Sequence, residues 1–256
     1  MAQCLFCYET RLTKEHLWPD WIVRLFKTRV PPRKGAYTAT HYRRGQPVRS
    51  WRQNTITSRT RLVCQQCNNE WMSDVEQCAQ PLLVPFIHTS RHHGPLTAEE
   101  HCALAAWVTL RSMVFESRHP EDRWAYYSDE DRRSFAHADP MFPPDNTLIW
   151  MGPFDGPRNS ADYFIDNYIS TRETVGVHNT TIILDQVAIA FSTWKGVRRR
   201  IDWKRFNADG WNDVVRLIWP ACRGKPVYWP PPRYLTLSML QTLRDRLAPS
   251  SITSRA

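Results

Sequence analysis

Long apolar runs are missing from this sequence of 256 residues. The longest candidates, residues 103–108 and 187–191, are far shorter than the ~18 residues that a membrane-spanning helix needs. The first residues also lack the apolar segment behind a positively charged start that marks a secretory signal. Hydrophobic residues make up 42% of the chain and charged residues 23%, which is typical of globular proteins and excludes wholesale disorder. We therefore expect an intracellular, cytoplasmic protein with no membrane partner.

Acidic residues are missing from the whole stretch between Trp21 and Asn69. This stretch contains eleven Lys and Arg residues, more than the net charge of +9 of the chain, so the remainder is slightly acidic. Nine of the eleven are Arg, whose planar guanidinium forms paired hydrogen bonds with phosphate oxygens. A basic surface can serve solubility alone, but this concentration of Arg with interleaved aromatic residues favours nucleic acid as the partner. The residues expected to bind it are Arg33, Lys34, Arg43, Arg44, Arg49, Arg52, Arg59 and Arg61.

The seven cysteines are an odd number, which argues against a disulfide framework in an intracellular chain. Four of them form two CxxC pairs, which commonly present four thiolates to one zinc ion. The 56 residues between the pairs exceed the ~15–20 of a compact zinc ribbon, so we expect an insertion between them. Two unrelated pairs, or a redox motif, are the alternatives, but neither pair lies in a βαβ pattern. We predict a structural zinc site formed by Cys4, Cys7, Cys64 and Cys67.

Polar residues follow each cysteine pair at short distance. Glu15 and His16 follow the first pair, and Asn68 comes directly after the second. Taken singly, Glu15 can be a surface acid, His16 a satisfied polar residue and Asn68 a helix N-cap. Beside a zinc site, the set suits metal-assisted cleavage of a phosphodiester bond. Oxygen ligands from Glu15 and Asn68 suit an ion such as Mg²⁺, and a neutral His16 can deprotonate a water molecule.

The combined pattern CxxC…EHLWP…CxxCN…E resembles the HNH endonucleases of the ββα-metal superfamily, in the subgroup with a four-cysteine zinc site. The resemblance covers roughly residues 1–80. It implies that Glu15 and Asn68 bind a catalytic Mg²⁺ or Mn²⁺, that His16 is the general base, and that the four cysteines hold structural Zn²⁺. It also implies hydrolysis of nucleic acid, DNA ahead of RNA, to 5′-phosphate and 3′-hydroxyl ends.

The sequence departs from the family pattern at several positions. The final histidine of the family has no clear match, and Trp71 stands where many members carry Lys or His. Glu76 matches a common family position on the following helix, where its role can be structural. His88, His92 and His93 lie downstream and are the next candidates for the base. The missing histidine supports an alternative function, a zinc-dependent nucleic-acid-binding module without catalysis; an interaction scaffold with a structural zinc is a third class.

We expect an α+β fold in two parts. Residues 1–90 form a zinc-stabilised ββα-metal (HNH-like) module with a basic insertion at 24–61, and residues 91–248 form an α+β domain of unknown role. Residues 249–256 are expected to be a flexible tail. Periodicity and capping signals predict helices over 20–28, 68–79, 97–117 and 236–247 and one that starts at 128. Strands are predicted within 36–63 and over 146–151, 163–169, 177–184 and 186–193. A proline-spaced connector is expected over 81–95, and edge strands limited by proline at 217–220 and 226–230.

Overall fold

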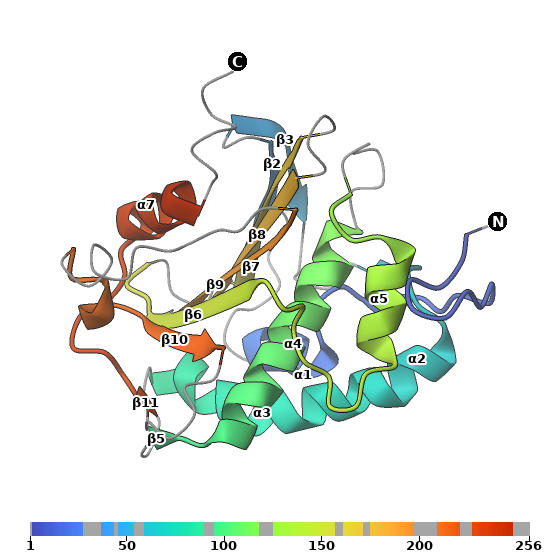
Figure 1. Cartoon of the computed structure of the whole chain (residues 1–256), viewed down its shortest axis with the longest axis horizontal. Helices are drawn as coiled ribbons and strands as arrows, with labels where there is room; N and C mark the ends of the chain where they lie inside the picture. The colour runs from blue at the N-terminus through green and yellow to red at the C-terminus, as the bar shows by residue number, and fades with distance from the viewer. Residues whose placement is uncertain are drawn as a thin grey trace.

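Helices and antiparallel sheets make up the fold, in agreement with the α+β expectation (Figure 1). No helix in the described part of the chain combines the length and the apolar character needed to cross a lipid bilayer. The structure is a computed structural model, and it describes residues 2–27, 37–43, 46–53, 59–89, 95–117, 125–156, 161–170, 175–196, 209–220 and 227–247.

A five-stranded antiparallel sheet with the order β10–β6–β9–β8–β7 lies at the centre of the fold. Side chains alternate between the two faces of a strand. Accordingly, Ile149 and Met151 of β6 belong to one buried cluster, while Leu148 and Trp150 belong to another. Helix α4 packs on the first face and helix α7 on the second, so both faces are covered. The strands are β6 (Thr147–Pro153), β7 (Ala161–Ser170), β8 (Val175–Leu184), β9 (Val187–Lys195) and β10 (Arg216–Trp219), close to the predicted ranges.

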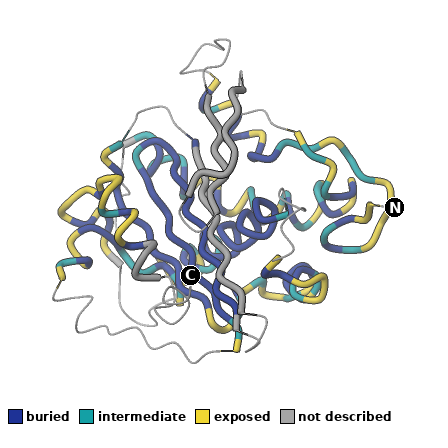
Figure 2. The backbone as a smooth tube through the Cα atoms, turned by 90° about the horizontal axis from the view of Figure 1, so that it is seen from above, coloured by how far each residue is buried: buried dark blue, intermediate teal, exposed yellow. Residues whose placement is uncertain are grey.

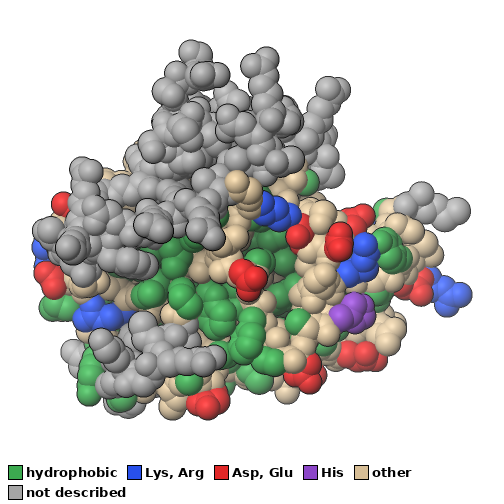
Figure 3. Space-filling view, in the orientation of Figure 1, with side chains coloured by type: hydrophobic (Ala, Val, Ile, Leu, Met, Phe, Trp, Pro, Cys, Tyr) green, Lys and Arg blue, Asp and Glu red, His purple; other side chains and the backbone are tan. Residues whose placement is uncertain are grey.

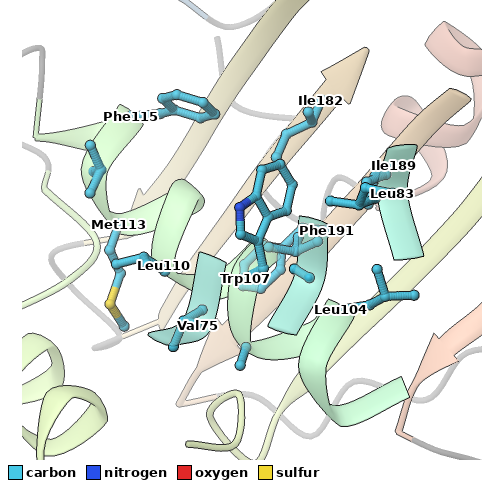
Figure 4. Packing of buried hydrophobic residues seen from close by; sticks show 14 of the residues in the cluster. Val75, Leu83, Leu104, Trp107, Leu110, Met113, Phe115, Ile182, Ile189 and Phe191 are labelled. Atoms are coloured by element: carbon cyan, nitrogen blue, oxygen red, sulfur yellow. The ribbon is translucent and has the colours of Figure 1, made fainter. Parts of the chain in front are cut away.

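Helix α4 (Ala98–Glu116) is the most deeply buried helix of the described residues. It begins with the capping box that the sequence predicts, because Thr97 Oγ1 accepts the Glu100 N–H and Glu100 Oε2 accepts the Thr97 N–H. Every residue from Leu104 to Glu116 is buried. In Figure 4 the indole of Trp107 points toward Ile182 of β8. Helix α4 therefore joins the sheet to the helices of the N-terminal part.

The remaining elements lie around this centre. Helix α5 begins after Ser128, where the sequence predicts a helix start, and the structure shows a capping box formed by Ser128 and Asp131. Three further strand pairs are antiparallel: β1 with β4, β2 with β3, and β5 with β11. Their bounds are β1 Glu15–His16, β2 Tyr37–Arg43, β3 Gln46–Gln53, β4 Arg59–Thr60, β5 Pro95–Leu96 and β11 Val227–Tyr228, and the other helices are α1 Asp20–Lys27, α2 Gln65–Asn69, α3 Trp71–Thr89, α5 Asp129–Ala136, the 3₁₀ turn η1 Trp211–Asp213 and α7 Leu237–Leu247.

Helix α3 corrects two expectations from the sequence. The helix predicted over 68–79 is divided at Glu70, and α3 then continues to Thr89 through Pro81 and Pro85, where a connector was expected. Each proline removes one backbone donor and favours a helix end. Tertiary packing overrides this local signal, because Leu83, Phe86 and Ile87 on the same segment are fully buried in the core.

One buried cluster includes residues from both sides of the predicted boundary at residue 90. Phe6 and Ile22 belong to the same cluster as Trp107 and Ile189. Figure 2 shows the buried segments gathered in the middle of the molecule and the exposed segments on the outside. The N-terminal part therefore folds against α4 and the sheet.

Candidate functional site

The four cysteines of the two CxxC pairs lie together. Their Sγ atoms are all within 4.8 Å of one another, and the Sγ atoms of Cys7 and Cys64 are 3.5 Å apart. None of the four is in a disulfide. Four sulfurs placed ~2.3 Å from one zinc ion are separated by about 3.8 Å in a tetrahedron. The cluster has the size and the donor set of a four-thiolate zinc site, so it can hold a metal such as zinc.

Backbone pairing holds the two cysteine pairs in this arrangement. The Leu5 N–H donates to Leu62 O, and Leu12 forms an antiparallel bridge with Cys64. Cys64 is also the N-cap of α2, and its sulfur accepts the Cys67 N–H. Burial raises the pKa of the Cys67 thiol, so a bound cation is needed to keep this sulfur as a thiolate at neutral pH.

Trp71 packs beside the cysteine cluster. Its ring makes an edge contact with Phe6, from the first CxxC pair, at a centroid distance of 5.0 Å. It also makes an edge contact with Phe135 of α5, at a centroid distance of 6.2 Å. Trp71 is therefore an aromatic packing residue between the first CxxC pair and α5.

Glu15, His16 and Asn68 line one pocket of about 310 Å³. Strands β1 and β4 pair so that Glu15 lies opposite Thr60 and His16 opposite Arg59. The chain then runs from β4 through Cys64 into α2, which carries Asn68. The site is therefore built from two antiparallel strands followed by a helix, and residues more than fifty positions apart reach one cavity.

The His16 ring is hydrogen-bonded to Arg59. Its Nε2 accepts the Nε–H of Arg59 at 3.1 Å, which places the proton of the neutral ring on Nδ1. Nδ1 lies 3.7 Å from Asp20 Oδ1. Burial, with a further contribution from the positive charge of Arg59, lowers the pKa of His16 below its usual value. The nitrogen that can accept a proton therefore already contacts a cationic side chain.

Asn68 lies within helix α2 and does not cap it. Cys64 is the N-cap, and the Asn68 N–H donates to Cys64 O at 3.1 Å, as in a regular helical turn. The N-cap interpretation of Asn68 is therefore wrong. The side-chain nitrogen donates to Asn69 Oδ1 at 3.3 Å, so the amide is oriented by its neighbour on the pocket wall.

Two further charged residues of the pocket, Glu76 and Arg111, were not predicted as site residues. Nη2 of Arg111 lies 2.9 Å from Glu76 Oε1, and Nη1 donates to Leu17 O at 3.4 Å. Burial raises the pKa of Glu76 and lowers that of Arg111. The only sequence signal for Arg111 is a single basic residue within the apolar stretch 104–115 of a predicted helix.

The structure describes the side chains of two of the predicted nucleic-acid-binding residues, Arg59 and Arg61. Arg59 contacts His16, and Arg61 is exposed. The described face in Figure 3 carries acidic and basic side chains interspersed around an apolar area. Of the other six predicted residues, three belong to the paired strands β2 and β3, where the structure describes the backbone: Arg43, Arg49 and Arg52. The other three, Arg33, Lys34 and Arg44, lie outside the described residues.

The alternative bases are not brought to the pocket by any described segment. His88 lies near the end of α3, about 26 Å along the helix from Trp71 at ~1.5 Å per residue, and it does not line the pocket. His92 and His93 lie outside the described residues. His16 is therefore the histidine that lines this pocket among the residues the structure describes.

A second polar cluster lies inside the core, away from this pocket. Ser112 Oγ is 2.7 Å from His178 Nε2, and His178 Nδ1 is 3.7 Å from Glu116 Oε1. The order resembles a nucleophile, base and acid, but Ser112 and His178 are 0% exposed, so no substrate reaches them. Burial lowers the pKa of His178 to about 3. The cluster is a buried hydrogen-bond network, and the titratable or charged groups around His178 are Glu116, Arg132, Tyr126 and Tyr127.

Comparison of the chain with protein-family models, with curated proteins and with solved structures found no match. The motifs of the sequence and the geometry of the pocket are therefore what indicate a function for this protein.

Proposed function

We propose that the protein is a metal-dependent nuclease of the HNH type, which hydrolyses phosphodiester bonds in nucleic acid, DNA ahead of RNA. One observation carries the proposal. Glu15, His16 and Asn68 line a single pocket next to a cluster of four cysteines, on a strand–strand–helix framework. These are the residues that the resemblance to HNH endonucleases selects from the sequence.

Each pocket residue has a role that suits its chemistry. The Glu15 carboxylate and the Asn68 amide oxygen would hold Mg²⁺ or Mn²⁺, which would supply positive charge to stabilise the phosphate and the departing 3′ oxygen. His16 accepts a proton at Nε2 from a water molecule whose oxygen attacks phosphorus. The bond from phosphorus to the 3′ oxygen breaks, and that oxygen takes a proton from solvent.

Arg59 connects substrate binding to the base. In the free protein its Nε–H donates to His16 Nε2. A phosphate group competes for the same guanidinium, because an anionic phosphate attracts the cationic guanidinium more strongly than the neutral imidazole does. When Arg59 turns to the phosphate, the acceptor nitrogen of His16 becomes available to water.

The four cysteines fit a structural zinc. With four thiolates, the coordination sphere is complete and leaves no open position for substrate. The four cysteines would hold the ion between the turn that carries Cys4 and Cys7 and the start of α2, and so would keep β1 close to Asn68. The Arg-rich segment between the two pairs supplies the expected contacts to the nucleic-acid backbone.

Incubation with plasmid DNA and with RNA tests this proposal. The zinc-loaded protein is expected to cut in the presence of Mg²⁺ or Mn²⁺ and to stop cutting when EDTA is added. Glu15→Ala and Asn68→Ala are expected to reduce the rate, and more divalent metal should restore part of it, because both residues act through metal affinity. A protein that binds nucleic acid but cuts neither substrate with any divalent metal would instead be the non-catalytic binding module.

A further inference from the structure

One face of α4 packs against residues 17–21, the segment that directly follows His16. Trp107, Arg111 and Phe115 are spaced by four residues, so they lie on one side of the helix. The ring of Phe115 makes an edge contact with Trp18 at 4.8 Å, and Trp107 lies 6.3 Å from Trp21. Arg111 is the polar member between these two aromatic contacts, and it is the one of the three that lines the pocket.

The guanidinium of Arg111 bridges the two walls of the pocket. Nη1 donates to the carbonyl of Leu17, the residue directly after His16. Nη2 pairs with Glu76 on α3, the helix that follows Asn68 and α2. A single side chain from outside the predicted module therefore contacts both segments that carry the site.

Stability alone does not account for an arginine at this position. The Arg111 side chain is 3% exposed and that of Glu76 22%, so the pair gives up much of its hydration. Replacing a buried ion pair with apolar residues of similar size is often neutral or stabilising. The neighbours on this face of α4 are aromatic, so an apolar residue would fill the same space. What an apolar residue would not supply is a guanidinium that donates to a carbonyl and pairs with a carboxylate at the same time.

We propose that Arg111 is a positioning residue of the nuclease site, which holds the His16 segment and helix α3 at the correct separation. This inference rests on the proposed function of the pocket. It makes the second half of the chain a part of the catalytic unit, because α4 completes a site whose other residues come from the N-terminal part. Holding groups in a productive geometry is a large term in catalysis, since a displacement of about 1 Å can cost about 100-fold in rate.

The full-length Arg111→Met variant tests this inference. We expect it to keep its zinc and its affinity for duplex DNA, while kcat falls by roughly 10–100-fold and KM changes little. Arg132→Met is the matched control, because Arg132 is also buried and paired with a carboxylate, on Glu116, away from the pocket. The control should lose stability and keep kcat. A kcat of Arg111→Met equal to that of the wild type would overturn the inference and leave the nuclease proposal intact.

Two gentler variants cover the case in which Arg111→Met does not fold. Arg111→Lys keeps the positive charge but not the planar guanidinium, and Glu76→Gln keeps the size of the Glu76 side chain without its negative charge. Both should lower kcat, and the double variant Arg111→Lys/Glu76→Gln should cost less than the product of the two single effects, because both changes act on one contact. Independent, multiplicative losses would contradict the bridge.

Amide hydrogen exchange provides a readout that does not need activity. Exchange in peptides that cover residues 15–20 should be faster in Arg111→Met, or in Arg111→Lys, than in the wild type and in Arg132→Met. Unchanged exchange would refute the positioning role even if the wild type cuts nothing. If the wild type does not cut nucleic acid but amide exchange in residues 15–20 is faster in the Arg111 variants, the nuclease proposal is refuted. The role of Arg111 in holding the His16 segment is then retained.

Discussion

Replacing His178 with Gln is expected to make the fold less sensitive to acid. His178 lies on β8, is 0% exposed, and its Nε2 is 2.7 Å from both Ser112 Oγ and Thr180 Oγ1. Burial, with a contribution from Arg132, lowers the pKa of His178 to about 3. The usual value in an unfolded chain is about 6.5.

The sign of the effect follows from these two pKa values. Between pH 6.5 and pH 3 the unfolded chain binds a proton at His178 and the folded protein does not. The stabilisation is therefore complete above the unfolded pKa and is lost as the pH falls. For one such group the free energy of unfolding decreases by about 2 kcal/mol between pH 7 and pH 5.

Urea unfolding of wild type and His178→Gln at pH 7 and pH 5 measures this difference. The variant should be less stable than the wild type at pH 7, because it loses hydrogen bonds to Ser112 and Thr180. Between the two pH values, however, the wild type should lose about 2 kcal/mol more than the variant. The exposed His137 provides the control, and His137→Gln should follow the wild type. Equal pH dependence of wild type and His178→Gln would refute the argument.

Three further predictions concern the metal sites and the basic segment. Elemental analysis should find about one zinc per chain, and Cys64→Ser should lose the zinc and lower the Tm. Cys78→Ser, at an exposed cysteine outside the cluster, should change neither zinc content nor Tm, and disulfide-bonded cysteines without zinc would contradict the site. The logarithm of the affinity for duplex DNA should fall with the logarithm of the salt concentration, at a slope of about −0.9 per phosphate contact, and the triple variant Arg43→Ala/Arg44→Ala/Arg49→Ala should flatten that slope. An affinity independent of salt would mean that the basic insertion serves solubility alone. The Mn²⁺ concentration needed for half-maximal cleavage should rise in Glu15→Gln and stay unchanged in Glu9→Gln, a surface acid outside the pocket; equal metal dependence in the two variants would exclude Glu15 as a ligand.

Local sequence signals predicted a large part of the fold. Helices begin after Thr97 and Ser128 as expected, because in each case a side chain satisfies backbone donors within the same turn. The four cysteines come together as their spacing predicts. In each case the decisive interactions lie within a few residues or follow from the geometry of one ion.

Features that depend on tertiary contacts were not predictable in the same way. Helix α3 continues through Pro81 and Pro85 because its neighbouring apolar residues are buried, which no local rule indicates. Arg111 reaches the pocket because α4 packs on the segment after His16, across more than ninety residues of sequence. The contact of Arg59 with His16 depends on the register of two very short strands.

The single-turnover rate of cleavage of a labelled DNA duplex by wild type and His16→Ala, with saturating Mn²⁺, tests the central claim most directly. His16→Ala removes the base and leaves the four cysteines and the Arg-rich segment unchanged. Both proteins should carry zinc and bind the duplex with similar Kd, while the variant cuts roughly 10²–10⁴-fold more slowly, the usual contribution of general base catalysis. A variant that cuts as fast as the wild type would contradict the assignment of the catalytic site to this pocket.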